Sequence, residues 1–110
     1  MADLTNEFLL PLINSQISRI SFALGDWYFE FDSEHYMEIF AIEDFIEQFG
    51  SLTAAVNWMY EVIGSKVDEI EFRETGDIMM SIAGRKLKIP KENINLESFA
   101  VSIAGDKRAI

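Results

Sequence analysis

The amino-acid sequence predicts an α+β fold on a mostly antiparallel sheet, and three observations lead to this class. Apolar and polar residues alternate with the period of half-buried strands on both sides of the middle of the chain. Residues 42–63 between them follow the 3.6-residue period of helices. Glycine-containing turn signals separate the alternating segments, which favours antiparallel neighbours. We therefore expect two strand meanders, a C-terminal helix and a central helix pair that covers one face of the sheet.

The length and composition favour a single domain over residues 1–110. A chain of 110 residues with 49% hydrophobic and 25% charged residues is typical of one globular unit rather than a disordered segment. The sequence shows no internal repeat, low-complexity segment or linker that would divide it.

A short helix is expected to open the chain. Thr5 is a suitable N-cap for a helix that ends near Gln16, and Pro11 would kink this helix from within. The apolar residues on one side of the helix are Phe8, Leu9, Leu12 and Ile13.

A β-hairpin and a third strand are expected next. Residues 19–24 and 27–32 alternate as two strands, and Gly25-Asp26 between them suits a two-residue hairpin turn. A further strand is expected over 36–41. The hairpin positions that should face the core are Ile20, Phe22 and Leu24, then Trp27, Phe29 and Phe31.

The helical period begins at Ile42. Ile42, Phe45, Ile46 and Phe49 form one apolar stripe, with acids in the first turn. Gly50 can close this helix, and Ser51 can cap a second helix that ends at Gly64. The buried face of the second helix is expected to hold Leu52, Val56, Met59 and Ile63.

The second meander is expected over 69–89. Strands over 69–73, 78–82 and 86–89 are separated by turns at Thr75-Gly76-Asp77 and Ala83-Gly84-Arg85. Pro90 should stop the last strand. Asn95 can then cap the C-terminal helix, with Leu96, Phe99, Ala100 and Ile103 facing inward; a strand over 98–103 is the alternative.

The charge is concentrated in one part of the chain. The formal net charge is -10, from 19 acids and 9 Lys and Arg residues. Residues 20–65 contain nine of these acids and no Lys or Arg, whereas eight acids and eight bases balance each other in 66–110. Such a one-sided field attracts cationic partners and disfavours nucleic acid as a ligand. A surface charge that only serves solubility is the simpler interpretation.

Several function classes find no support in the sequence. There are no cysteines, which excludes disulfides and thiolate chemistry and fits a reducing cytoplasm. We find no secretory signal, membrane span, Walker loop or nucleophile motif, and the scattered acids lack the order of a calcium loop. His35 stands beside Glu34 and near Glu38, but no nucleophile accompanies it, so we expect an exposed or partly packed histidine. We expect no enzyme activity, cofactor or metal site.

In its size, lack of cysteines and Lys/Arg-free stretch, the chain resembles the small acidic immunity proteins of bacterial contact-dependent growth inhibition and other polymorphic toxin systems. The Tyr28-Glu30-Asp32 and Glu43-Asp44-Glu47 sets also carry this resemblance. It implies a non-catalytic cytoplasmic protein that masks the active or substrate-binding site of a basic toxin, for which we expect a nuclease. The expected partner-binding residues, with Tyr28 as the anchor, are Tyr28, Glu30, Asp32, Glu34, Glu38, Glu43, Asp44 and Glu47.

Two alternatives remain at this point. A DNA-mimic inhibitor would use the same acids in two rows spaced like duplex phosphates and would bind several DNA-binding proteins. A small-ligand-binding or scaffold domain would carry its charge incidentally and show no salt-sensitive protein partner.

Overall fold

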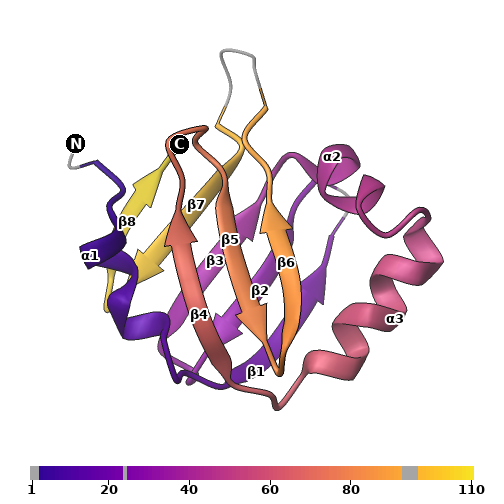
Figure 1. Cartoon of the computed structure of the whole chain (residues 1–110), viewed down its shortest axis with the longest axis horizontal. Helices are drawn as coiled ribbons and strands as arrows, with labels where there is room; N and C mark the ends of the chain where they lie inside the picture. Colours follow the sequence, from indigo (N-terminus) through magenta and orange to yellow (C-terminus); the bar gives the residue numbers. More distant parts are fainter. Residues whose placement is uncertain (1–2, 24, 93–96) are drawn as a thin grey trace.

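In the computed structural model the backbone forms two antiparallel sheets that face each other across one apolar core (Figure 1). Residues 3–23, 25–92 and 97–110 are described, and no helix among them is long and apolar enough to cross a membrane. The elements in this part of the chain are α1 (Asn6–Leu9), the 3-10 helix η1 (Leu10–Leu12), β1 (Ile17–Phe22), β2 (Trp27–Phe31), β3 (His35–Ile39), α2 (Ile42–Glu47), α3 (Leu52–Val62), β4 (Val67–Phe72), β5 (Ile78–Ile82), β6 (Arg85–Ile89), β7 (Phe99–Ile103) and β8 (Asp106–Ala109).

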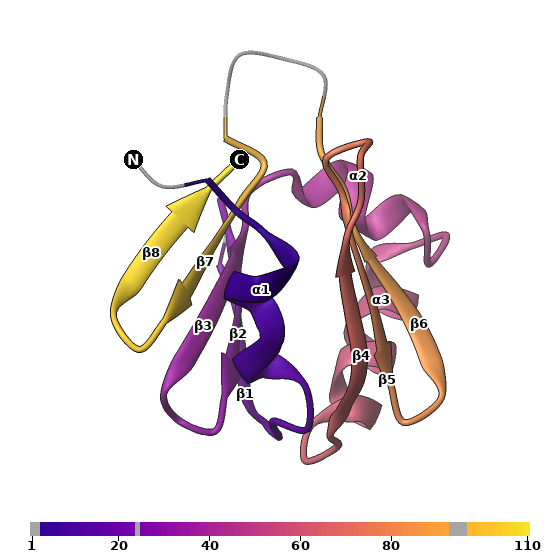
Figure 2. The same ribbon diagram turned by 60° about the vertical axis from the view of Figure 1, so that its left-hand side comes forward.

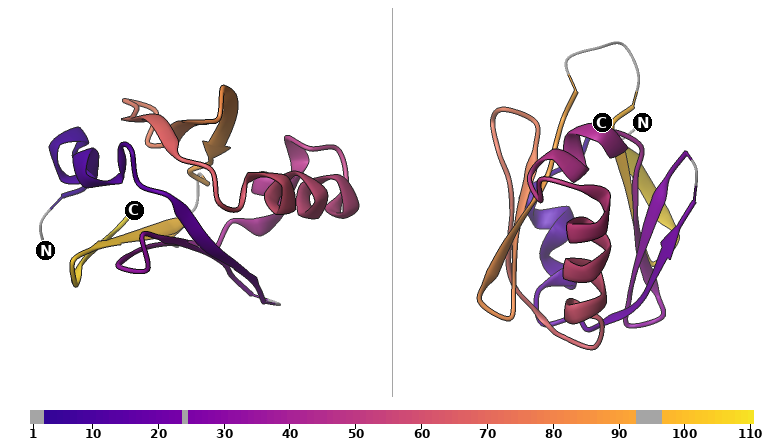
Figure 3. Two further views of the ribbon diagram at one scale, coloured as in Figure 1. Left: turned by 90° about the horizontal axis from the view of Figure 1, so that it is seen from below. Right: turned by 90° about the vertical axis from the view of Figure 1, so that its right-hand side faces the viewer.

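The sheets contain five and three strands. The first has the order β1-β2-β3-β7-β8 and the second β4-β5-β6. Figure 2 shows the sheets as two layers, and Figure 3 shows α1 at one open side between them and α2 and α3 at the other. The α+β class and both meanders are confirmed. The expectation of helices that cover one face of a single sheet is wrong, because the second meander forms its own sheet and covers the first.

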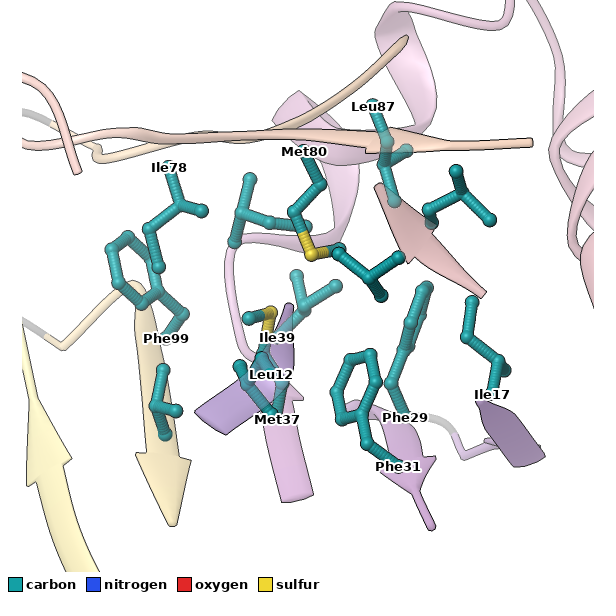
Figure 4. Close-up of a cluster of buried hydrophobic side chains, with 14 of the residues drawn as sticks. Leu12, Ile17, Phe29, Phe31, Met37, Ile39, Ile78, Met80, Leu87 and Phe99 are labelled. Carbon is teal, nitrogen blue, oxygen red and sulfur yellow. The ribbon is translucent and has the colours of Figure 1, made fainter. Parts of the chain in front are cut away.

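The core lies between the two layers, as Figure 4 shows. Trp27, Phe29 and Phe31 of β2 are buried, as their alternation predicted. The residues that meet them from the three-stranded sheet include Ile78, Met80, Ile82, Leu87 and Ile89, all buried. Because both sheets bury one face each, alternating residues suffice to build this core.

The C-terminal helix is a wrong prediction, and the alternative strand over 98–103 is confirmed, because this segment forms β7. Phe99, Val101 and Ile103 are buried and alternate with outward positions, and β7 pairs with β3. The strand is preferred because the edge of β3 offers backbone partners to an apolar segment that can bury alternate side chains. The expected cap and first helical residue, Asn95 and Leu96, lie outside the described residues.

Helix α1 differs from expectation in extent, and α3 differs in orientation. Thr5 accepts a hydrogen bond from the Phe8 N–H as predicted, but α1 gives way to η1 at Leu10 instead of continuing toward Gln16. Ser51 caps α3 as predicted. The buried face of α3, however, holds Ala55, Met59 and Val62, while Leu52 and Ile63 are exposed.

The hairpin between β1 and β2 forms with a shifted turn. Phe22 pairs with Trp27, and the Ala23 N–H donates to the Asp26 carbonyl oxygen, so Asp26 flanks the turn rather than occupying its centre. Phe22 lies at the sheet edge and is 45% exposed, although it was expected in the core. Leu24, the third expected core residue of this strand, lies outside the described residues.

The structure shows an internal repeat, contrary to the expectation of none. The segment Leu12-Ile13-Asn14-Ser15-Gln16-Ile17 leads from η1 into β1, and Val62-Ile63-Gly64-Ser65-Lys66-Val67 leads from α3 into β4. Asn14 and Gly64 both have positive φ, 69° and 89°. A β-bulge follows Ile17 in one half and Val67 in the other, and each half continues as a three-stranded meander.

Reciprocal hydrogen bonds relate the two halves by an approximate twofold axis. Gln16 and Lys66, which are equivalent in the repeat, form an antiparallel bridge with each other. Asn14 N–H donates to Val67 O at 2.7 Å, and the equivalent Gly64 N–H donates to Ile17 O at 2.8 Å. The two sheets are therefore joined at one corner by matching segments of the two halves.

Candidate functional site

The outer face of the five-stranded sheet gathers the predicted tyrosine and two of the predicted glutamates. Side chains alternate between the faces of a strand, so the residues between the buried positions point to solvent. The register places Arg19, Glu30, Tyr36, Ser102 and Lys107 in one row across the sheet, and Ser21, Tyr28 and Glu38 in the next. We call these eight residues the outer face.

Two tyrosines lie side by side at its centre. The rings of Tyr28 and Tyr36 have centroids 5.2 Å apart and an interplanar angle of 51°. Partial burial, followed by the Glu38 carboxylate, raises the pKa of Tyr28, so its hydroxyl remains a hydrogen-bond donor at neutral pH. A hollow of about 250 Å³ opens beside the rings and is lined by Arg19, Ser21, Tyr28, Glu30 and Tyr36.

The carboxylates of the outer face have defined partners. Glu30 accepts a hydrogen bond from the Ser18 hydroxyl at 3.0 Å, which fixes it at the rim of the hollow. Glu38 Oε1 lies 3.3 Å from Lys107 Nζ of β8. Arg19 and Lys107 thus bring two cations onto the face that holds Glu30 and Glu38. The sheet combines strands from both charge regions of the chain, which the linear charge pattern did not show.

The turn between β2 and β3 uses its polar groups for structure. Asp32 Oδ1 accepts a hydrogen bond from the Gln16 N–H at 2.9 Å and so holds the turn against the start of β1. His35 is buried, contrary to expectation, and its Nδ1 accepts from the Ala104 N–H at 3.1 Å. Glu34 stays exposed beside His35. Of these residues, Glu34 has the carboxylate most available to a partner.

The three acids of α2 lie apart from the outer face. Glu43, Asp44 and Glu47 are exposed on the helix that follows β3. Asp44 and Glu47 line a hollow of about 400 Å³ together with Lys88 and Lys91. The eight predicted residues therefore occupy three places: the outer face, the β2–β3 turn and α2.

The structure adds three residues to the candidate site that the sequence prediction did not include. Tyr36 has the same strand parity as Glu38, so the alternation of β3 could have identified it. Arg19 falls just outside the stretch without cations. Lys107 could not be predicted, because no strand was expected after Gly105 and β8 joins the sheet only by pairing with β7.

The internal repeat provides a comparison for the outer face. At the equivalent positions of the three-stranded sheet, Met79, Ser81 and Lys86 replace Tyr28, Glu30 and Tyr36. The hollow there is similar in size, about 300 Å³. Since the same meander forms with these other side chains, the fold does not require two tyrosines and a glutamate on the outer face.

The outer face offers groups that can bind a cationic side chain. A carboxylate beside aromatic rings can pair with a guanidinium or ammonium group while the rings stack on it. Across the described ranges 3–23, 25–92 and 97–110, no group of three or more His, Asp or Glu residues could hold a metal ion. The chain matches no protein-family model, no curated protein and no solved structure.

Proposed function

We propose that this protein is a non-catalytic immunity protein that binds a basic protein toxin, a nuclease in the simplest case, and neutralises it in the cytoplasm by covering its active or substrate-binding site. The observation that carries the proposal is the tyrosine pair beside Glu30 on the outer face. The other half of the repeat builds the same three-stranded meander without these residues, so their presence calls for a role outside folding.

A cationic side chain of the partner is the ligand that this geometry favours. An arginine in the hollow would pair with Glu30 and stack on Tyr36, while the Tyr28 hydroxyl could donate to a carbonyl of the partner. Nucleases bind phosphates with Lys and Arg, and an inhibitor that occupies those groups prevents substrate binding. The exposed acids Glu34, Glu43, Asp44 and Glu47 would contribute to the long-range attraction.

The outer face gives less support to a DNA mimic. Such an inhibitor needs rows of negative charge, whereas Arg19 and Lys107 stand at the two ends of one row of this face. An immunity protein needs only a local match to one partner and tolerates these cations.

The three-stranded sheet shows which side chains the meander accepts at these positions. The triple variant Tyr28→Met/Glu30→Ser/Tyr36→Lys gives the outer face the equivalent residues of that sheet, so it should fold while losing the tyrosine pair. Co-expressed with the product of the neighbouring open reading frame, the wild type should protect cells from growth inhibition and the triple variant should not. Association should slow steeply with salt, because screening weakens charge attraction between exposed groups.

A matched control changes the three-stranded sheet instead. The variant Glu69→Arg/Glu71→Ser gives this sheet the residues that stand at the equivalent positions 19 and 21 of β1, and it should leave protection intact. Full protection by the triple variant, with its fold verified by circular dichroism, would contradict the proposal. Loss of protection in the control alone would move the interface to the three-stranded sheet.

A further inference from the structure

Both edges of the three-stranded sheet are closed by amide side chains. At β4, Asn6 Oδ1 accepts from the Phe72 N–H at 2.6 Å and Asn6 Nδ2 donates to Phe72 O at 3.3 Å. At β6, Gln48 does the same with Lys88, at 2.9 Å and 2.7 Å. Each amide thus occupies the place that a neighbouring strand would take, which protects an edge from pairing with another chain.

The five-stranded sheet has one protected and one open edge. The short strand β8 carries Asp106, Lys107 and Arg108, and charged side chains disfavour pairing at an edge. Residues 20–23 at the end of β1 carry no charge. Within the described residues, no side chain bonds to the backbone of Ile20 or Phe22 on the side away from β2.

The hairpin register shows which backbone N–H and C=O groups of β1 do not bond to β2. Ala23 bonds to Asp26, so the next hydrogen-bonded pair of this antiparallel ladder is Ser21 with Tyr28. The N–H and C=O groups of Ile20 and Phe22 therefore point away from β2. The repeat shows the contrast: Phe72, the equivalent of Phe22, is covered by Asn6 from the first position of α1, whereas the first position of α3 is Leu52.

An apolar flank of α3 lies next to this open edge. Trp58 contacts Phe49 and lies under the Arg85 guanidinium of β6, so the opposite flank of α3 faces β1 (Figure 3). That flank carries Leu52, Val56, Tyr60 and Ile63, of which Tyr60 is 79% and Leu52 57% exposed. Phe22 adds to this surface and packs edge-on against Trp27 at 4.7 Å. We call the edge of β1 over 20–22 and this flank the β1–α3 surface.

The charge of the surroundings selects among possible occupants. The β1–α3 surface comes wholly from the stretch 20–65, which holds nine acids and no Lys or Arg. The nearby cations face elsewhere: Arg19 belongs to the outer face, and Arg85 pairs with Glu61 on the far flank of α3. A second copy of the chain would bring another net charge of -10 against it and be repelled. A segment with Lys or Arg on its solvent side would be attracted.

We propose that the β1–α3 surface binds an extended segment of a basic partner, which adds as a strand to β1. The backbone of Ile20 and Phe22 supplies its hydrogen bonds, and alternate apolar side chains of the segment pack on the flank of α3. Lys or Arg residues occupy the other positions. This site is separate from the tyrosine pair and does not depend on the identity of a toxin.

A synthetic peptide of alternating isoleucine and lysine tests the proposal without any toxin. In the 110-residue protein, we expect the peptide to slow hydrogen exchange of the Ile20 and Phe22 amides and leave the Phe72 amide unchanged. Phe22→Lys should weaken peptide binding by at least about tenfold, which is about 1.4 kcal/mol. Leu10→Lys, at an exposed apolar residue of η1 on the opposite open side, is the matched control and should bind like the wild type.

Two further peptides separate backbone pairing from charge. N-methylation at alternate residues removes the donors that a strand needs and should abolish binding, and a peptide of isoleucine and glutamate should bind at least about tenfold more weakly. If either peptide binds as tightly as the unmodified isoleucine–lysine peptide, the proposal is overturned. It is also overturned if, without peptide, hydrogen exchange of the Ile20 and Phe22 amides slows as the protein concentration rises, because a second copy of the chain would then occupy the surface.

Discussion

At the scale of single residues, several polar side chains serve the turns rather than the surface. Asp32 holds the β2–β3 turn, His35 connects β3 to the β7–β8 turn, and Asp77 accepts a hydrogen bond from the Thr75 hydroxyl beside β5. Such bonds satisfy backbone and side-chain groups that burial would otherwise leave unpaired. A chain with 19 acids therefore commits some of its carboxylates to folding, and only the remainder is available to a partner.

Asp77 should make stability depend on pH in acid solution. Burial alone raises its pKa, but hydrogen bonds from Thr75 and from its own backbone, with the charges of Lys88 and Arg73, lower it below 3.8. The unfolded chain then binds the proton more readily, so the stabilisation is present above about pH 3.8 and is lost as the pH falls through the folded pKa. Urea titrations should show that Asp77→Asn is less stable at neutral pH and loses less stability on acidification. An unchanged acid profile in this variant would show that other groups carry the dependence.

At the scale of elements, helices protect the edges of the smaller sheet. α1 and the end of α2 each supply one amide that bonds to both backbone groups of one strand residue. Contrary to the prediction, the helices do not cover a sheet face. They close the open sides of the two layers, and two of them supply the amides that protect β4 and β6. Residues 20–22 of β1 remain an uncharged edge segment without such an amide among the described residues.

Truncation of Gln48 should measure this edge protection. Gln48→Ala removes two hydrogen bonds to β6 at a partly solvated site, so the free energy of unfolding should fall by about 1 kcal/mol. Hydrogen exchange of the Lys88 amide should accelerate at the same time. Gln48→Glu keeps the acceptor for the Lys88 N–H and should show slower exchange there than Gln48→Ala. If all three proteins exchange alike, the amide does not protect the edge.

At the scale of the whole molecule, two related halves share one core. The halves meet through the Gln16–Lys66 bridge and through the apolar residues between the sheets. Neither meander covers its own inner face, so each half depends on the other for burial. We therefore expect the chain to unfold in one cooperative transition.

Phe29 is suited to test this shared core. It is fully buried on β2 and packs against Phe31 and Phe45. Phe29→Ala should lower the free energy of unfolding by about 3 to 5 kcal/mol through lost burial and the cavity that remains. Fluorescence and far-ultraviolet circular dichroism should report the same midpoint in denaturant. A cost below about 1 kcal/mol, or separate midpoints, would contradict this description of the core.

The sequence by itself determined the elements whose signals are local. Alternation in 27–31 and 78–82 placed Trp27, Phe29, Phe31 and the inner residues of β5 in the core, and hydroxyl side chains marked the helix starts at Thr5 and Ser51. These features depend on periods and caps that a short stretch of chain contains. The sequence also identified Tyr28 and Glu30 as outward residues of the hairpin, because strand parity is a local property. Asp32, expected on the same face, follows the end of β2 and lies in the turn.

The tertiary structure decided what depends on distant partners. Residues 99–103 became a strand because β3 offered an edge, and α3 buried Ala55 rather than Leu52 because its orientation is set by packing between the sheets. The sequence alone does not reveal the repeat, because its halves share few identical residues beyond the turns into β1 and β4. Tyr36, Arg19 and Lys107 joined the outer face through pairing across strands. Local patterns fix the identity of an element, whereas its neighbours are fixed by burial and backbone pairing over the whole chain.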